Sequence, residues 1–336
     1  MPLETQLRAS SKTRQSRPGG IRVGLVNNMP DSALESTETQ FTRLLESAAG
    51  TIPVQLRLYH LPEIARGASA REHIDRNYWH IQALEQDPPD ALIVTGMEPG
   101  GGPLTSEPYW DRFVKLLQWA DANTVSSIWS CLAAHAAAQC LHGVQRQRRA
   151  EKLSGVFEHQ LLAGHPLLAG VSEPFRLPHS RWNDLPMEAL RASGYTILSW
   201  SESTGADTFI EQRGSLLVCF QGHPEYEETS LLKEYRRDVG RFLRGQQATY
   251  PTQPQGYFSP SVSAQLDAFS ARALATPREE LLAEFPPIDA GGVRNTWQAP
   301  AARIYGNWLA FVAAGRAAAP RPQAATLERP ARVRSS

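Results

Sequence analysis

Short apolar runs alternate with segments of helical spacing through the first half of the chain, and this order limits the fold more than any other feature. Each apolar run is a predicted strand, and helical segments carry apolar residues three or four positions apart. The predicted strands cover residues 21–26, 54–59, 90–95 and 125–130, and the predicted helices cover 36–48, 109–122 and 132–141. Strands and helices in this order build a mostly parallel sheet with helices on both faces. We therefore expect an α/β fold.

The second half of the chain predicts shorter strands and longer helices. The strands cover 195–200, 208–211 and 216–220, and the helical segments cover 226–243, 262–284 and 303–314. We expect a single domain over residues 21–315, with a helical insertion at 260–290 and a helical extension at its C-terminal end. Residues 1–20 are rich in Ser, Arg and Gly, and residues 316–336 in Pro, Ala and Arg, so we expect two disordered tails.

The formal net charge of zero hides an uneven distribution of charge. The chain has 34 basic and 34 acidic residues, yet each terminal stretch of 22 residues carries five basic residues against one acidic residue. The tails are therefore basic and the body between them is acidic. A nucleic-acid-binding core is normally basic, and neither tail has an aromatic residue that could stack on bases. We expect no nucleic-acid partner.

Composition argues against three further classes of protein. No apolar run reaches about 18 residues, so no membrane-spanning helix is expected. The first twenty residues lack the apolar core of a secretory signal. The three cysteines have neither the number nor the spacing of a disulfide framework or a zinc site, so no metal is expected. A reducing, cytoplasmic location fits this pattern.

One cysteine stands at a position that favours chemistry. Cys131 lies where the predicted strand 125–130 meets an alanine-rich helix, which is the layout of a nucleophile elbow. The helix N-terminus favours a thiolate, and the next backbone N–H, that of Leu132, would point at a developing oxyanion. The alternative is a buried structural cysteine. Cys140 and Cys219 lie inside apolar runs and fit that structural role better.

A histidine follows the predicted strand 216–220 closely. His223 begins a His-Pro-Glu sequence and should lie at the carboxyl edge of the sheet, where open α/β folds place their sites. Glu225 is spaced to orient the imidazole and to stabilise its protonated form. Alone, the motif is more typical of a histidine packed at a turn. Together with the elbow, Cys131, His223 and Glu225 are a candidate nucleophile, base and orienting group.

Several motifs, in order along the chain, resemble those of the homoserine O-succinyltransferase family. They lie at residues 28–30, 38–45, 91–96, 109–110, 128–134, 151–159, 178–181, 222–226 and 236–238. The similarity covers residues 21–258 and returns more weakly at 295–308. The resemblance implies a class I glutamine amidotransferase-like fold, which is flavodoxin-like. Glutamine-hydrolysing relatives share the elbow and the His-x-Glu sequence but lack the motifs at 151–156 and 178–181.

The resemblance implies a ping-pong acyl transfer in methionine biosynthesis. Cys131 attacks the thioester of succinyl-CoA and forms an acyl-enzyme, and His223, held by Glu225, then takes the proton of the L-homoserine hydroxyl. The products are O-succinyl-L-homoserine and CoA. Succinyl-CoA is a co-substrate, and no bound cofactor or metal is implied. Members of the family are commonly homodimers, so a homodimer is one expectation.

The resemblance also assigns residues to recognition of the acceptor. Arg237 matches the family's carboxylate-binding arginine, and Lys152 and Ser180 match other positions of the acceptor site. Spacing alone favours a different interpretation of Arg237, as a solvated charge on a helix near Glu234 and Asp238. Lys152 alone would be a surface lysine, and Ser180 a turn residue.

Two positions bear on details of specificity. In the family, a glycine after the Thr-Gly of the third strand leaves room for succinate, whereas a glutamate there excludes it. Gly100 matches this position and favours succinyl-CoA, but Glu98 would exclude succinate if it entered the pocket. His135, one helical turn beyond Cys131, either takes part in the site or makes a packing or polar contact.

Other functions remain open at this level. The first alternatives are a homoserine O-acetyltransferase and a serine O-acyltransferase of the same family. A remoter alternative is a glutamine amidohydrolase, which would hydrolyse glutamine and use no acyl-CoA. The last is a non-catalytic binding protein that uses its basic tails on acidic surfaces, against which the intact Cys, His and Glu set argues.

Overall fold

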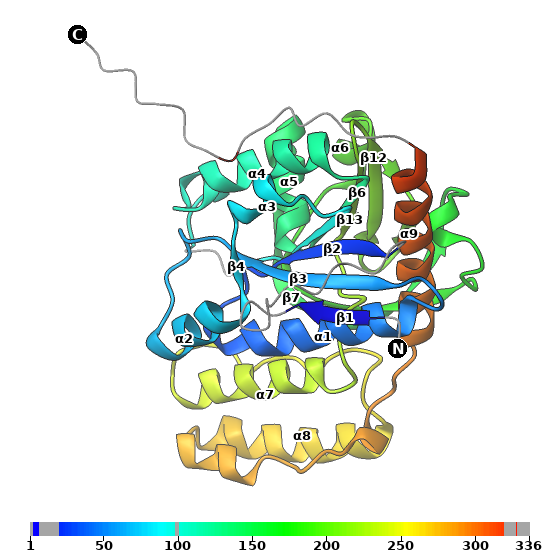
Figure 1. Cartoon of the computed structure of the whole chain (residues 1–336). Helices are drawn as coiled ribbons and strands as arrows, with labels where there is room; N and C mark the ends of the chain where they lie inside the picture. The colour runs from blue at the N-terminus through cyan, green and yellow to red at the C-terminus, as the bar shows by residue number, and fades with distance from the viewer. Residues whose placement is uncertain (1–2, 7–19, 98–100, 319–326, 328–336) are drawn as a thin grey trace.

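A central sheet of nine strands organises the part of the chain that the structure describes (Figure 1). The computed structural model describes residues 3–6, 20–97, 101–318 and 327. The strands of this sheet are β1 (Leu3–Gln6), β2 (Ile21–Val26), β3 (Val54–His60), β4 (Trp79–His80), β5 (Ala91–Val94), β6 (Ser126–Ser130), β9 (Thr196–Ile197), β12 (Thr208–Gln212) and β13 (Leu216–Phe220). Their order is β1-β3-β2-β5-β6-β13-β12-β9, and β4 pairs with β3.

Five of these strands follow the order of flavodoxin-like folds. β2 pairs with β3 and β5, β5 pairs with β6, and β6 pairs with β13, all in parallel. With β1 and β4 left aside, β3-β2-β5-β6-β13 is the order 2-1-3-4-5 along the chain. β12 and β9 add an antiparallel edge. The predicted α/β fold with a mostly parallel sheet is therefore confirmed.

Helices cover both faces of this sheet. They are α1 (Leu34–Ala48), α2 (Ala68–Asn77), α3 (Ala83–Gln86), α4 (Trp110–Asn123), α5 (Leu132–His142), α6 (Met187–Ala192), α7 (Ser230–Leu243), α8 (Pro260–Ala275) and α9 (Gln298–Ala318). Buried side chains of α1, α7, α8 and α9 share one hydrophobic core with the sheet, and those of α4 and α5 share another. β5 and β13 are buried along their whole length, which explains why their sequences are continuous apolar runs.

A second, antiparallel sheet was not foreseen in the sequence. It consists of β11 (Gly205–Ala206), β10 (Ser199–Ser201), β7 (Gln147–Leu161) and β8 (Phe175–Asp184) in that order. The single strand expected at 195–200 is divided between the two sheets, because β9 pairs with β12 whereas β10 pairs with β7. The long β7–β8 ribbon carries the predicted site residues Lys152 and Ser180.

Other boundaries differ from expectation at identifiable places. The helix expected from 226 begins at Ser230, because the carbonyl of Tyr226 accepts a hydrogen bond from the Trp297 indole instead of a helical N–H. Within the expected tails, residues 3–6 form β1 beside β3, α9 runs to Ala318, and Leu327 is buried. Residues 260–290 are helical, in α8 and a 3-10 turn at Glu279–Glu284, and α8 lies outermost, beyond α7 (Figure 1). Their status as an insertion stays a prediction.

The carboxyl ends of the parallel strands meet at one edge of the sheet. Val94 of β5 pairs with Trp129 of β6, and Ser130 of β6 pairs with Phe220 of β13. The segments that follow these strands therefore begin side by side, and this edge is where flavodoxin-like folds bind their ligands. Among the described helices, none is both long enough and apolar enough to cross a membrane.

Gly155 of β7 provides a test of how tightly the ribbon is held. Its φ is +150°, and a Cβ there would lie 2.6 Å from the backbone nitrogen of Gln255, a residue that is hydrogen-bonded to both Ser154 and Val156. We expect Gly155→Ala to lower the free energy of unfolding by more than about 2 kcal/mol, measured by urea denaturation. Gly164→Ala, where a Cβ meets open space, should change it by less than about 0.5 kcal/mol. Equal effects would contradict this account.

Candidate active site

The nucleophile elbow predicted at Cys131 is present in the backbone. Cys131 joins β6 to α5 with φ 52° and ψ −114°, and it is the one non-glycine residue with positive φ among the described residues. Its N–H donates to the carbonyl of Phe220 in β13 at 2.8 Å. A strained residue of this kind persists only where the surrounding structure fixes it, and such residues concentrate at functional sites.

The other two cysteines have a different environment. Cys219 is fully buried in β13 and Cys140 is partly buried in α5, and burial raises the pKa of both thiols. A buried, protonated thiol is inert. This agrees with the structural role expected for Cys140 and Cys219 and leaves Cys131 as the candidate nucleophile.

A glycine that sequence analysis did not single out faces the predicted oxyanion donor. Leu132 is the first residue of α5, so its N–H has no partner within the helix. Gly96 follows β5, and a Cβ built on it would lie 3.2 Å from the Leu132 nitrogen. Only glycine keeps the approach to this N–H open. The signal in the sequence is the glycine directly after a buried strand.

His223 and Glu225 are paired as predicted. The imidazole Nδ1 lies 2.8 Å from Glu225 Oε1, and both side chains are buried. The ring of Tyr226 stacks on the imidazole with ring centres 4.2 Å apart. The other ring nitrogen, Nε2, is buried and has no nitrogen or oxygen partner within the described residues, while Cys131 is close enough to interact with the imidazole. The imidazole is therefore fixed on one side and has a nitrogen left for chemistry on the other.

Charge controls the protonation of His223. Burial acts to lower its pKa, but the negative charges of Cys131 and Glu225 outweigh burial and raise the pKa well above 6.5. The raised pKa favours an imidazolium beside Cys131. This is the electrostatic arrangement that an activated cysteine requires.

The three predicted acceptor-site residues converge on two carboxylates. Lys152 Nζ lies 2.8 Å from Asp238 Oδ2 and 3.3 Å from Glu234 Oε2. Ser180 Oγ donates to Glu234, and Arg237 Nε donates to Asp238 at 2.9 Å. Burial opposes ionisation of Glu234, but Lys152 and hydrogen bonds outweigh it and hold the pKa of that carboxyl below its ordinary value. The cluster is therefore a paired set of opposite charges, and Arg237 is not an isolated surface charge.

Tyr226 connects this cluster to the candidate catalytic base, His223. Its ring stacks on His223, and its hydroxyl donates to Glu234 Oε1 at 2.5 Å. Sequence analysis treated Tyr226 only as part of a motif and Glu234 only as a neighbour of Arg237. The spacing of Glu234 and Asp238, four residues apart on α7, places both carboxylates on one helix face and was the available signal.

Three positions with predicted or open roles remain to be placed. Gly100 and Glu98 lie outside the described residues, so the acyl-specificity role of Gly100 stays a prediction. His135 is buried, and its Nε2 lies 3.0 Å from Gln221 Oε1. Burial lowers the pKa of His135 to about 3, so the imidazole is neutral. This contact favours the structural alternative for His135, a polar contact.

The fold and the site together define an α/β enzyme with a Cys–His–Glu set at the carboxyl edge of its sheet. The homoserine O-succinyltransferase family profile matches residues 5–318. A homoserine O-succinyltransferase of Methylorubrum extorquens is 46% identical over 293 residues, which cover 87% of each chain. One of Rhodopseudomonas palustris is 43% identical, over 93% of this chain and 94% of that one. The chain belongs to the homoserine O-succinyltransferase family, whose members are acyltransferases.

Solved structures give a weaker likeness. A glutamine amidotransferase of Methylobacillus flagellatus is 13% identical, covers 87% of this chain and 95% of that chain, and superposes with a TM-score of 0.47. A likeness at this level carries no part of the assignment, which depends on the strand order and on the family.

Replacing Glu225 tests the electrostatics of the pair. Glu225→Gln removes a charge that raises the pKa of His223, so we expect that pKa to fall in an NMR titration of the imidazole. Acyl transfer should slow about 100-fold or more. The raised pKa stabilises the folded chain fully below pH 6.5, and the stabilisation is lost as pH rises through the raised value. The variant should therefore lose more stability at pH 6 than at alkaline pH.

The pair between His142 and Glu211, 2.9 Å apart and away from the catalytic residues in sequence, is the matched control. Glu211→Gln should leave both the pKa of His223 and the rate of acyl transfer unchanged. An unaltered His223 titration in Glu225→Gln would overturn the assignment of Glu225.

Proposed function

We propose that this chain transfers the succinyl group of succinyl-CoA to the hydroxyl of L-homoserine through a thioester on Cys131. The products are O-succinyl-L-homoserine and CoA. The observation that carries the proposal is the strained Cys131 elbow beside a buried His223–Glu225 pair. Membership of a family of acyltransferases supports the same chemistry.

In the first half-reaction the Cys131 sulfur attacks the thioester carbonyl. A bond forms between this sulfur and the succinyl carbon, the bond from that carbon to the CoA sulfur breaks, and the departing sulfur takes the proton of the His223 imidazolium. The Leu132 N–H is placed to stabilise the oxyanion, and Gly96 leaves the approach open. One thioester replaces another, so the acyl-enzyme is close in energy to the substrate.

Acylation also changes the electrostatics of His223. The Cys131 charge is one of the two that raise the imidazole pKa, and it disappears when the sulfur becomes a neutral thioester. The pKa of His223 therefore falls in the acyl-enzyme, which favours the neutral imidazole more than in the free enzyme. The same residue is thus an acid toward CoA and a base toward the acceptor, because the charge beside it differs between the half-reactions.

In the second half-reaction the homoserine hydroxyl gives its proton to His223 Nε2. Its oxygen forms an ester bond to the succinyl carbon, and the bond from that carbon to the Cys131 sulfur breaks. Glu225 holds Nδ1 throughout, which fixes the tautomer with Nε2 ready to accept. The thiolate and imidazolium pair is then restored.

The carboxylate cluster supports recognition of an amino acid. Arg237 is 45% exposed, and the bonds to Asp238 engage only its Nε and Nη2 side, so the guanidinium still presents N–H groups to a substrate carboxylate. Glu234 and Asp238 supply negative charge for the substrate ammonium. Lys152 and Ser180 hold these carboxylates in place.

Mass spectrometry of the protein incubated with succinyl-CoA tests the acyl-enzyme. We expect a succinyl adduct on Cys131 that forms without acceptor and disappears when L-homoserine is added. Cys131→Ala should form no adduct, whereas Cys140→Ala should behave like the unaltered chain. If only acetyl-CoA forms an adduct, the proposed acyl group is acetyl and not succinyl. If serine discharges the adduct and homoserine does not, the proposed acceptor is serine. Glutamine hydrolysis without any adduct would refute the acyltransferase proposal.

Arg237→Ala tests the acceptor site separately. Loss of the guanidinium should raise the KM for homoserine about tenfold or more. The rate of Cys131 succinylation should not change, because the acceptor is absent from that step. Arg236→Ala is the matched control, since Arg236 lies on the same helix over the ring of Phe285. Equal KM values in the two variants would remove Arg237 from the site.

A further inference from the structure

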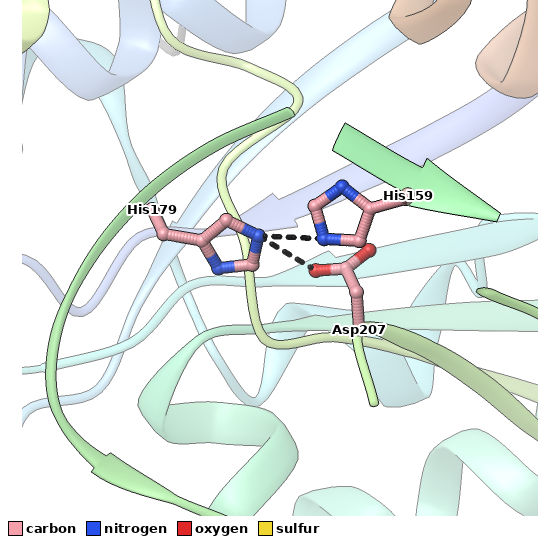
Figure 2. Close-up of side chains that lie close together, drawn as sticks. All are labelled: His159, His179 and Asp207. Carbon is pink, nitrogen blue, oxygen red and sulfur yellow. Dashed lines mark hydrogen bonds and ion pairs between the residues drawn. The ribbon is translucent and has the colours of Figure 1, made fainter. Parts of the chain in front are cut away.

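A buried cluster of His159, His179 and Asp207 has the composition of a metal site (Figure 2). All three side chains are fully buried, and their ligand atoms lie within 4.8 Å of one another. Two imidazoles and a carboxylate are a common ligand set for zinc and iron. Neither the proposed chemistry nor the acceptor site uses this cluster.

The hydrogen bonds around His179 fix the position of its proton. Arg181 Nη1 contacts His179 Nδ1, and a guanidinium is only a donor, so Nδ1 carries a lone pair. The proton of the neutral imidazole is therefore on Nε2. That nitrogen lies 3.0 Å from His159 Nε2 and donates to it, and His159 Nδ1 in turn donates to the carbonyl of Phe157 at 3.0 Å. The nitrogen of His179 that would bind a metal thus already holds a proton.

Burial, like this chain of hydrogen bonds, favours neutral imidazoles. It lowers the pKa of His179, and the positive charge of Arg181 lowers that pKa further. At His159 burial outweighs the charge of Asp207 and the Phe157 carbonyl, which act to raise the pKa. The pKa of each imidazole therefore lies below its ordinary value, which favours the neutral form. A metal-bound histidine usually donates the N–H of its other ring nitrogen to a carbonyl or a carboxylate. The other ring nitrogen of His179 instead faces the cationic Arg181.

The cluster also holds the backbone that leads to His223. Asp207 Oδ1 accepts a hydrogen bond from the Gly222 N–H at 2.7 Å, and the carbonyl of Pro178 accepts one from the His223 N–H at 2.8 Å. A Cβ on Gly222 would lie 2.7 Å from Asp207 Oδ1 and 2.9 Å from a ring carbon of His179. The cluster is therefore packed directly against the two peptide units that set the position of the catalytic imidazole.

We propose that Asp207, together with His179 and His159, is a metal-free positioning network that fixes the Gly222–His223 backbone so that the imidazole faces Cys131. The inference rests on the proposed function, in which His223 serves Cys131. Asp207 is its central residue, because its carboxylate both accepts the Gly222 N–H and faces the proton-bearing nitrogen of His179, 3.7 Å away.

Variants of Asp207 test the positioning role. Asp207→Ala leaves the Gly222 N–H without its acceptor, and we expect kcat to fall about 10- to 100-fold while each KM changes by less than about threefold. Asp207→Asn keeps an oxygen acceptor and should retain most of the activity. The control is Asp90→Ala, because Asp90 is also buried and accepts the Arg22 N–H at 2.8 Å. Asp90 directly precedes β5, so it lies at the amino ends of the parallel strands, away from Cys131 and His223. The control variant should lose stability without loss of kcat.

A second variant distinguishes the network from a metal site. The side-chain oxygen of Gln in His159→Gln can accept the His179 proton, but an amide is a poor ligand for zinc or iron. We expect the folded variant, checked by its thermal unfolding, to keep activity within about threefold, and the unaltered protein to contain no stoichiometric metal by elemental analysis. One tightly bound metal per chain, lost in His159→Gln together with activity, would overturn the proposal.

Alkylation of Cys131 by iodoacetamide separates this inference from the proposed function. The reaction needs the cysteine–histidine pair but no acyl-CoA, and peptide mapping identifies the modified cysteine. Asp207→Ala should slow alkylation of Cys131 about tenfold, whereas Asp90→Ala should not change it. An unchanged rate in Asp207→Ala would refute the positioning role. Slower alkylation in a protein that forms no succinyl adduct would keep the positioning role and refute the proposed substrate.

Discussion

The parallel pairing of β6 with β13 is the interaction on which the site depends. Ser130 pairs with Phe220, and the hydrogen bond from the Cys131 N–H to the Phe220 carbonyl continues this ladder for one more residue. Both strands therefore end at the same level, and the elbow and the His223 loop leave the sheet side by side. A shift of one residue would turn the side chains of β13 to the opposite face and separate Cys131 from His223.

The second sheet adds polar side chains to the candidate site. The β7–β8 ribbon carries Lys152 and Ser180 to α7, where Glu234 and Asp238 receive them. Tyr226 lies between this cluster and the catalytic pair. Burial and the charge of Glu234 raise the pKa of its hydroxyl, so it remains a neutral donor to Glu234 while its ring packs on His223. Tyr226 thereby links the cluster of paired charges to the imidazole.

Patterns along the chain predicted the elements and site residues that depend on neighbours in the sequence, and they missed those that depend on contacts between distant residues. The strands at 21–26 and 216–220 were correct to the residue. The strand at 216–220 is buried along its whole length and is therefore a continuous apolar run, and in the strand at 21–26 only Arg22 is less than fully buried. β7 and β8 were missed because they are rich in charged residues and lack a clear alternation. Cys131, His223 and Glu225 could be predicted to meet because each follows a strand, whereas the role of Glu234 depends on a contact across 54 residues to Ser180. No local pattern contains that information.

The neutrality of His179 matters to the chemistry as well as to the question of a metal. His179 and His223 are close enough to interact electrostatically, and a positive charge on one would disfavour protonation of the other. A metal ion or an imidazolium at His179 would therefore act against the raised pKa of His223. Burial and Arg181 favour a neutral His179, so the His179 imidazole itself adds no positive charge beside His223. This constraint explains why a set of two histidines and an aspartate can lie beside a catalytic histidine and serve as a scaffold.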